Sequence, residues 1–207
     1  MKIFIAVPTF ENIYPDTFKS IYDLENPHGH EYVFEFVRGY DIATARNRIV
    51  FRAKDLKADY ILMVDNDVTL PPDALTKLLE HDKEVVLGFY AHRNNQNEYD
   101  GKTNLCKLGE FNYTNQFTED DLRAIREEGE TLIQIHGGGM GCACIKTSLF
   151  DVIHYPYYDW VNYDDEHRGM LSEDLYFCEQ CKWVNVPVYA DPRVGCGHLF
   201  RKIQTCM

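Results

Sequence analysis

Short apolar runs that alternate with helix-like segments constrain the fold of this chain more than any other feature of its sequence. Four such runs are expected to be strands, and they cover residues 3–7, 32–37, 60–64 and 85–89. Between them, residues 17–24 and a longer segment ending near Lys57 are expected to be helices. Asp41 is suited to cap the longer helix, in which apolar residues recur at helical spacing. This alternation predicts an α/β fold with a mostly parallel central sheet flanked by helices on both faces.

Ligands of open α/β sheets bind beyond the carboxyl ends of the strands. In this sequence the rule points to Pro8-Thr9, Asp65-Asn66-Asp67 and Ala91-His92-Arg93. The polar stretch 94–104 is expected to be a mobile loop. From residue 132 onward the pattern changes to shorter strands and glycine turns, and a helix is expected near residues 173–182. We therefore expect a single domain, 1–207, whose second half completes the cleft of the first.

Composition and charge exclude some classes of protein. The 207 residues carry a net charge of −12, which repels nucleic-acid backbones and makes a nucleic-acid partner or acceptor less favoured. No apolar run approaches the roughly 18 residues that span a bilayer, and no signal-peptide pattern is present, so the expected location is cytoplasmic. The seven cysteines, an odd number, are expected to be reduced thiols.

The segment Asp65-Asn66-Asp67 is the sharpest chemical feature, because a buried strand delivers two carboxylates to the sheet edge. Divalent cations such as Mn²⁺ or Mg²⁺ prefer hard oxygen ligands and leave coordination positions for phosphate oxygens. This spacing would let Asp67 reach a metal while Asp65 turns towards a ribose or a metal-bound water. The alternative is a plain tight turn, for which Asp and Asn are equally suited.

Several segments occur in an order that resembles glycosyltransferases of the GT-A fold, in particular those like family 2. They are Val7-Pro8-Thr9, Ala45-Arg46-Asn47, Asp65-Asn66-Asp67, the run Gly137-Gly138-Gly139-Met140-Gly141, Ser172-Glu173-Asp174 and Gly197-His198. The resemblance covers nearly the whole chain. It implies a Rossmann-related sheet with a small C-terminal mixed extension, as a minimal catalytic core. It also implies a metal-dependent enzyme that moves a sugar from a nucleoside-diphosphate sugar to an acceptor hydroxyl.

The resemblance assigns donor-site roles to matching residues. Pro8, Thr9 and Glu11 would line the nucleoside pocket, and Arg46 and Asn47 would face the nucleotide and its phosphates. Asp65 and Asn66 would also contact the donor. The metal, Mn²⁺ or Mg²⁺, would be held by the following residues: Asp67, His198 and Asp65. In the alternative interpretation, Arg46 is a solvated helix residue, Asn47 bonds locally and His198 is structural.

Glu173 and Asp174 are the candidate catalytic pair that the resemblance implies, with Asp174 taking the proton of the acceptor hydroxyl if the reaction inverts. In a second interpretation these residues only stabilise the start of a helix, with Ser172 as its N-cap and the two acids interacting with the positive end of the helix dipole. Residues 1–104 would form the nucleotide- and metal-binding half, and residues 105–207 the acceptor and catalytic half. A UDP-sugar is the expected donor; the acceptor and the stereochemistry stay open.

Three alternatives compete with this interpretation. Cys178-x-x-Cys181 and Cys142-x-Cys144, with Cys196 and His198, could form a zinc-stabilised binding module. The chain could also be an inactive protein of the same fold. A sugar nucleotidyltransferase is disfavoured because no glycine-rich phosphate loop follows the first strand. The glycine run 137–139 is either a close backbone approach or a simple turn, and the aromatic segment 154–160 is either an acceptor platform or core.

Overall fold

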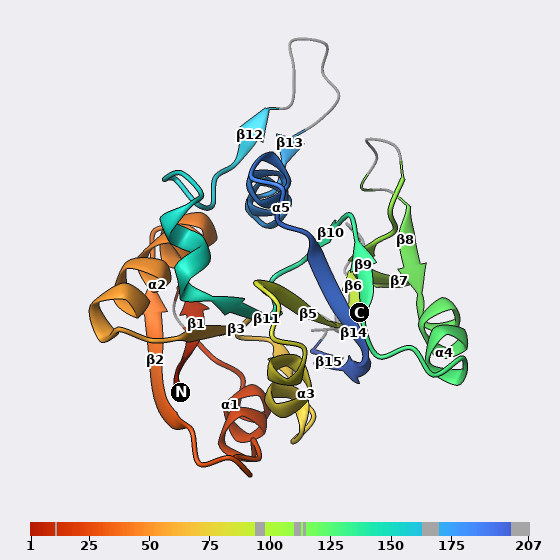
Figure 1. The fold of residues 1–207 in the computed structure, drawn as a ribbon, viewed down its shortest axis with the longest axis horizontal. Coiled ribbons are helices and arrows are strands. Elements are labelled where there is room, and N and C mark those ends of the chain that lie inside the picture. Colours follow the sequence, from red (N-terminus) through yellow and green to blue (C-terminus); the bar gives the residue numbers. More distant parts are fainter. Residues whose placement is uncertain (11, 94–97, 110–112, 114, 163–169, 200–207) are drawn as a thin grey trace, which may run out of the picture.

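The computed structural model describes all residues except 11, 94–97, 110–112, 114, 163–169 and 200–207. Its centre is a seven-stranded sheet in the order β2-β1-β3-β11-β5-β14-β9 (Figure 1). The strands are β1 (Lys2–Thr9), β2 (Glu31–Arg38), β3 (Tyr60–Val64), β5 (Val85–Phe89), β9 (Ile133–Ile135), β11 (Cys142–Lys146) and β14 (Val188–Gly195). β1 is parallel to β2 and β3, and β14 is parallel to β5, whereas β11 and β9 are antiparallel to their neighbours. The sheet is mostly parallel, as predicted.

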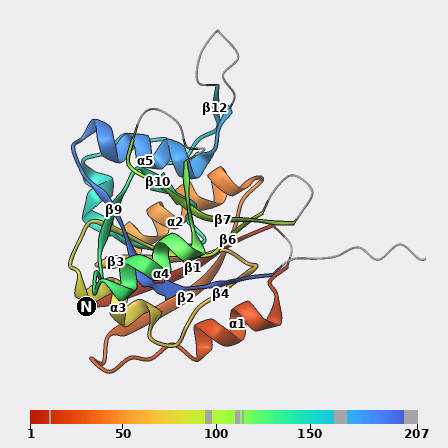
Figure 2. The same cartoon turned by 90° about the vertical axis from the view of Figure 1, so that its right-hand side faces the viewer.

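Helices cover both faces of this sheet (Figure 2). α1 (Pro15–Tyr22) and α3 (Ala74–Glu80) lie on one face; α2 (Ile42–Leu56), the 3₁₀ helix η1 (Thr147–Asp151) and α5 (Glu173–Trp183) lie on the other. Side chains of β1 alternate between the two layers because successive residues of a strand point to opposite faces. Phe4 packs in the α2 and α5 layer, whereas Ile3 and Ile5 pack in the α1 and α3 layer.

The helix starts follow the polar residues that the sequence offers. The Asp41 carboxylate accepts a 2.7 Å hydrogen bond from the Thr44 N–H, which confirms Asp41 as the N-cap of α2. At α4 (Glu119–Glu127), Thr118 and Asp121 form a reciprocal capping box. Backbone groups at these helix ends are therefore satisfied locally.

A second, smaller sheet corrects the loop prediction for residues 94–104. It has the order β10-β7-β6, with β8 also pairing with β7, and its strands are β6 (Ala91–Arg93), β7 (Tyr99–Cys106), β8 (Gln116–Thr118) and β10 (Gly137–Gly138). Residues 99–104 are therefore strand, while 94–97 lie outside the described residues. The polar Asn104 is accommodated because its side-chain oxygen accepts from the Tyr90 N–H at 2.8 Å.

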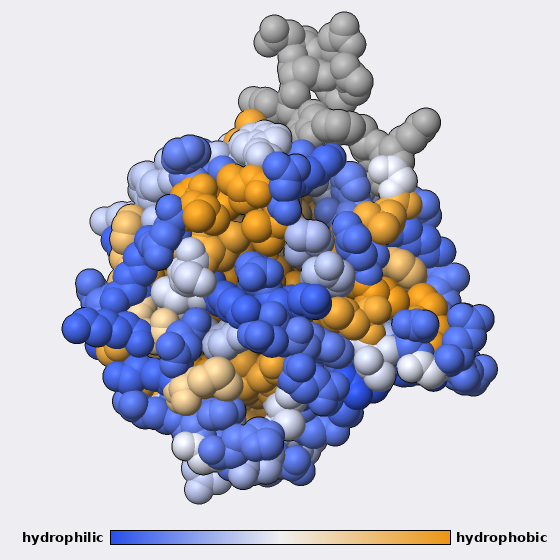
Figure 3. All heavy atoms as spheres, in the orientation of Figure 1, coloured by the Kyte–Doolittle hydropathy of each residue, from blue (hydrophilic) through white to orange (hydrophobic). Residues whose placement is uncertain are grey.

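Two short strand pairs complete the fold. β12 (Val161–Asn162) pairs with β13 (Met170–Leu171), and β4 (Val68–Thr69) pairs with β15 (Gly197–His198). Within the described part of the chain, no helix is both long and apolar enough to cross a membrane. The face seen in Figure 3 is largely hydrophilic, with hydrophobic residues gathered near η1 and α5.

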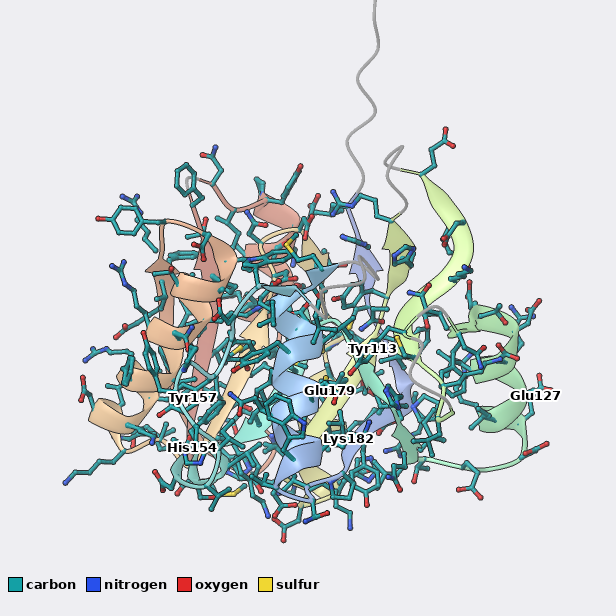
Figure 4. All side chains as sticks on the ribbon, turned by 90° about the horizontal axis from the view of Figure 1, so that it is seen from above. Tyr113, Glu127, His154, Tyr157, Glu179 and Lys182 are labelled. Atoms are coloured by element: carbon teal, nitrogen blue, oxygen red, sulfur yellow. The ribbon has the colours of Figure 1, made fainter. Side chains whose placement is uncertain are left out.

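The aromatic segment 154–160 is partly core and partly surface. Tyr157 and Tyr158 are buried, whereas Tyr155 and Trp160 are exposed. The Gln180 amide, on α5, donates 2.8 Å hydrogen bonds to the carbonyls of His154 and Pro156. Figure 4 labels His154 and Tyr157 in this segment. Packing against the core therefore accounts for half of these rings and leaves the other half open to solvent.

Candidate functional site

The turn Asp65-Asn66-Asp67 lies at the carboxyl end of β3, between two cavities. A cavity of about 380 Å³ on the β1 side is lined by Pro8, Thr9, Phe10, Gly39, Tyr40, Asp41, Ile42, Ala45 and Asn66. A cavity of about 550 Å³ on the other side includes Tyr90, Arg93, Asp100, Lys102, Ser172, Asp174 and His198 in its lining. Asn66 is fixed in the turn, because its amide donates to the Asn12 carbonyl at 2.7 Å. Asn66 of the turn thus lines the smaller cavity, and Asp67 contacts Arg93 and His198, which line the larger one.

Asp67 and His198 are brought together by pairing of β15 with β4. In that pairing His198 stands opposite Val68, and the Leu199 N–H donates to the Asp67 carbonyl at 2.8 Å. Gly197 is required here, because a Cβ at this position would lie 2.4 Å from the Thr69 hydroxyl oxygen. The His198 Nε2 and the Asp67 Oδ2 are 3.5 Å apart.

The tautomer of His198 follows from its second contact. Its Nδ1 lies 2.7 Å from the Ala91 carbonyl, which only accepts hydrogen bonds, so Nδ1 carries the proton in the neutral ring. The Nε2 lone pair is then directed to the Asp67 side, as in a metal-ligating histidine. Two ligands about 2.1 Å from one ion can be 3.5 Å apart. A carboxylate with an imidazole fits Mn²⁺ better than Mg²⁺, which prefers all-oxygen sets.

Arg93 contacts both of these residues. The rule that ligands bind beyond the carboxyl ends of strands pointed to Arg93 in the sequence, but it assigned no role to this residue. Its Nη2 lies 2.5 Å from the His198 Nε2 and also bonds the Asp67 carboxylate. Burial alone would raise the pKa of Asp67, but the neighbouring His198 ring and the Arg93 guanidinium, which donates to the carboxylate, hold this pKa below its usual range. Asp67 is therefore ionised under ordinary conditions.

Asp65 does not join this pair. Its Oδ1 accepts from the Arg46 Nη2 at 2.9 Å, and among the described residues it forms no close three-ligand group with Asp67 and His198. The prediction of Asp65 as a metal ligand thus finds no direct support, because its carboxylate is turned towards an arginine. Its N–H donates to the Gly141 carbonyl at 3.1 Å, which anchors the turn to the neighbouring strand.

Arg46 is buried, with 1% of its surface exposed, and this corrects the interpretation of Arg46 as a solvated helix residue. Its Nη1 donates to the Glu173 Oε1 at 2.5 Å and is ion-paired with Asp174, while Nη2 bonds Asp65. Burial opposes the charge, but the carboxylates of Asp65 and Glu173 raise the pKa of Arg46 further above its usual range. Three carboxylates share one arginine, so the cluster keeps a net negative charge.

Asn47 also differs from its predicted role of facing the nucleotide. Its amide nitrogen donates to the carbonyls of Ala43 and Tyr158, and its oxygen accepts from the N–H groups of Tyr157 and Tyr158. All these groups belong to the protein backbone. Asn47 therefore fastens the 157–158 segment to α2.

The first turn of α5 presents two acids with different surroundings. Glu173 is 4% exposed and is held by Arg46, whereas the Asp174 side chain is 17% exposed and lines the larger cavity. Ser172 precedes them at the N-cap position, but its side chain makes no capping hydrogen bond. Of the pair, only Asp174 faces space that a substrate could enter.

Two groups of cavity residues were not found from sequence. The Tyr90 hydroxyl accepts from the Gly141 N–H at 3.1 Å, and burial raises the pKa of Tyr90 well above its usual range. Asp100 and Lys102 come from β7, in the stretch predicted as a loop. The alternation of apolar and polar residues in 99–106 is too weak to predict this strand from the sequence. Pro8 and Thr9, which were predicted to line the nucleoside pocket, line the smaller cavity, and Glu11 lies outside the described residues.

Behind the larger cavity, Tyr113 donates a 2.5 Å hydrogen bond to the buried Glu179 on α5. Figure 4 labels Tyr113, Glu179 and Lys182, and the Lys182 ammonium lies 3.6 Å from Glu179. This contact attaches one wall of the cavity to the helix that carries Asp174.

The cysteines named for a zinc site lie on separate elements. Cys142 and Cys144 are in β11, and Cys178 and Cys181 are in α5. Burial raises the pKa of Cys181 to about 12 and that of Cys178 above its usual range, which disfavours thiolate ligands. Cys206 lies outside the described residues.

Among the described residues one other group could hold a metal ion, at Glu80, His81 and Asp191. Arg193 already bonds the Asp191 carboxylate and pairs with Glu80. The group therefore acts as an ion-pair network between α3 and β14, apart from the two cavities.

Comparison with known proteins decides the family. The family model described as glycosyl transferase family 2 matches residues 23–152. The chain belongs to glycosyl transferase family 2. This match includes Arg46, the Asp65-to-Asp67 turn and Arg93. A search of curated protein sequences gave no match to this glycosyltransferase.

Solved structures share the fold of this glycosyltransferase. A197 from STIV has 16% identity and a TM-score of 0.66, over 97% of this chain and 87% of that one. TarS residues 1–349 from S. aureus, in complex with UDP-GlcNAc, has 15% identity and a TM-score of 0.55, over 99% of this chain and 60% of that one. GalNAc-T7 with UDP, GalNAc and Mn²⁺ has 11% identity and a TM-score of 0.64, over 97% and 43%. The glycosyltransferase described here thus spans less than two thirds of each of the last two structures.

Proposed function

We propose that this glycosyltransferase takes its sugar from a nucleoside-diphosphate sugar, with a divalent cation, and transfers it to an acceptor hydroxyl. The observation that carries the proposal is the pair of cavities on either side of the Asp65-Asn66-Asp67 turn. Such an arrangement has room for a nucleoside on one side and for sugar and acceptor on the other. UDP is the preferred nucleotide, because the TarS and GalNAc-T7 structures were obtained with UDP-GlcNAc and with UDP.

The smaller cavity suits the nucleoside. Tyr40, 85% exposed, and Phe10 offer rings against which a base can stack, and Pro8 and Thr9 contribute backbone at the end of β1. Asn66 lies on the same wall, next to the turn. A nucleoside bound here would direct its diphosphate across the turn, towards Asp67 and His198.

Asp67 and His198 are the proposed cation ligands, for which Mn²⁺ is the better fit. When bound, the cation would supply charge to stabilise the departing nucleoside diphosphate. The protein residues fix its position: β15 holds His198 opposite Val68, and the Ala91 carbonyl sets the ring orientation. Three carboxylates pair with the single guanidinium of Arg46, and this excess of acidic groups favours binding of a cation nearby.

Asp174 is the proposed general base. It would accept the proton of the acceptor hydroxyl as that oxygen bonds to the anomeric carbon and the bond from this carbon to the diphosphate oxygen breaks. Direct displacement of this kind inverts the anomeric centre. Glu173 positions Asp174 by anchoring the first turn of α5 to Arg46. In functional terms, residues 105–207 supply the base and the cation ligand His198, and residues 1–104 supply the nucleotide site and the cation ligand Asp67, together with one wall of the larger cavity.

The test is release of nucleoside diphosphate from a panel of nucleoside-diphosphate sugars with Mn²⁺, comparing wild type with Asp174→Asn. Loss of a general base is expected to lower turnover by on the order of 10²–10⁴ while nucleotide binding is kept. Asp151→Asn is the matched control, because that carboxylate is 70% exposed and lines neither of the two cavities. Equal turnover in wild type and Asp174→Asn would refute the assignment of the base, and no binding of any donor would refute the donor site.

A further inference from the structure

Arg93 occupies the space between the two proposed cation ligands. It is the last residue of β6, and its side chain is 33% exposed. Its Nη2 contacts the Asp67 Oδ2 and lies 2.5 Å from the His198 Nε2. The same guanidinium nitrogen thus bonds both atoms that would face the ion.

The spacing makes the two occupants mutually exclusive. The ligand atoms are 3.5 Å apart, and an ion about 2.1 Å from each, on the side of the pair that faces Arg93, would overlap the Arg93 Nη2. An arginine carries only donors and is always charged, so it satisfies an anionic oxygen and an imidazole lone pair together. A divalent ion cannot enter until this guanidinium has moved, since like charges repel strongly at such short range.

We propose that Arg93 is a resident cation that competes with the divalent ion for Asp67 and His198. This inference rests on the proposed function in placing the ion at these two residues. The larger cavity offers the displaced side chain a place to go, because Arg93 lines it together with the carboxylates of Asp100 and Asp174. Arg93 would then leave the ligand pair as the ion arrives and face the space proposed for sugar and acceptor. Metal affinity without nucleotide is weakened as a result, because only the fraction of molecules with Arg93 displaced can bind.

The experiment is a Mn²⁺ titration without nucleotide, followed by isothermal calorimetry and by the paramagnetic resonance signal of free Mn²⁺. Arg93→Gln is expected to bind Mn²⁺ about tenfold more tightly than wild type, because the competitor is gone. Arg123→Gln, on the exposed face of α4, loses the same charge and is expected to match wild type. Adding Asp67→Asn to Arg93→Gln is expected to abolish the gain.

Equal or weaker Mn²⁺ binding by Arg93→Gln overturns the proposal, as does absence of binding in both proteins. A measurement on the wild type covers the case in which Arg93→Gln does not fold. The side-chain N–H signal of Arg93 in an NMR spectrum is expected to shift on saturation with diamagnetic Mg²⁺, and an unmoved signal overturns the proposal. Because no sugar or nucleotide is present, these outcomes are independent of the transfer assay with Asp174→Asn.

Discussion

Arg46 on α2 holds Glu173 on the first turn of α5 through a 2.5 Å hydrogen bond between Nη1 and Oε1, with both side chains buried. The residues are far apart in sequence, and their contact ties the helix that carries the proposed base to α2 and to the part of the sheet proposed to bind the nucleotide. Asp65 and Asp174 bond the same guanidinium, so the arginine fixes the relative position of the cation turn and the base.

Replacing Arg46 is expected to be costly. Arg46→Met would leave buried Glu173 without its charge partner, and breaking such a pair destabilises proteins by about 3–5 kcal/mol. The measurement is urea unfolding of wild type and variant. Arg123→Met, whose side chain is 55% exposed, is the control and is expected to change stability by less than about 0.5 kcal/mol. A similar small change for Arg46→Met would contradict a structural role.

Tyr40 is expected to contribute to nucleotide affinity without contributing to stability. Tyr40→Ala removes a ring that lines the smaller cavity, and loss of base stacking costs about 1–3 kcal/mol, or roughly tenfold in affinity. Calorimetric titration with UDP and Mn²⁺ measures the effect. Tyr22→Ala, at an 81% exposed ring on α1, is the matched control. Unchanged UDP affinity in Tyr40→Ala would mean that the nucleoside binds elsewhere.

Because of Asp121, the free energy of unfolding is expected to decrease as the pH falls into the acid range. Contacts with Lys107 and Thr118 lower its pKa to about 2, below the value of about 3.9 for an unfolded chain. The pKa of Asp121 is lower in the folded protein than in the unfolded chain. The contribution of this carboxylate to the free energy of unfolding is therefore complete above about pH 4 and is lost as the pH falls towards 2.

The variant that tests this is Asp121→Asn, which removes one half of the capping box and is expected to cost about 1 kcal/mol at pH 7. Unfolding free energies of the two proteins, measured from pH 7 to pH 2, are expected to converge at the acid end. A difference that stays constant with pH would show that the charge of Asp121 contributes nothing.

Thiol chemistry separates the transferase from a zinc-stabilised module. In a Cys206→Ser background, five of the six remaining thiols are expected to react slowly with a disulfide reagent, because Cys106, Cys142, Cys144, Cys178 and Cys181 are buried, whereas Cys196 is partly exposed and is expected to react first. A chelator is expected to leave the rate unchanged, whereas denaturant exposes all of these thiols. Faster labelling on adding chelator alone would indicate that a metal protects the cysteines.

Local signals explain what could be predicted from sequence. The Asp41 cap, the buried strand 60–64 and the polar residues that follow it are each encoded within a few positions, so these elements were predicted closely. The role of Asp67 followed from its place after a buried strand, whereas the role of His198 came only from the order of motifs, because nothing near residue 198 indicates β15. They stay predictions, now supported by the contact between the two side chains.

Contacts between distant segments explain what could not be predicted. Burial of Arg46 depends on carboxylates from β3 and α5, so its own helix gives no sign of it. Arg93 reaches Asp67 because β6 pairs with β7, a strand that reads as a polar loop. Asn47 turns inward because the 157–158 backbone needs partners for its buried groups.

The two-residue ladder between β15 and β4 has a consequence for local unfolding. Short ladders open easily, because few hydrogen bonds and little apolar surface hold them. An ion shared by Asp67 and His198 would clamp the two sides of this ladder, so that its opening requires release of the ion. Amide hydrogens at positions 68 and 198 would then exchange with solvent more slowly as the ion concentration rises. Amide hydrogen exchange at this ladder would thus show whether the glycosyltransferase has bound the ion.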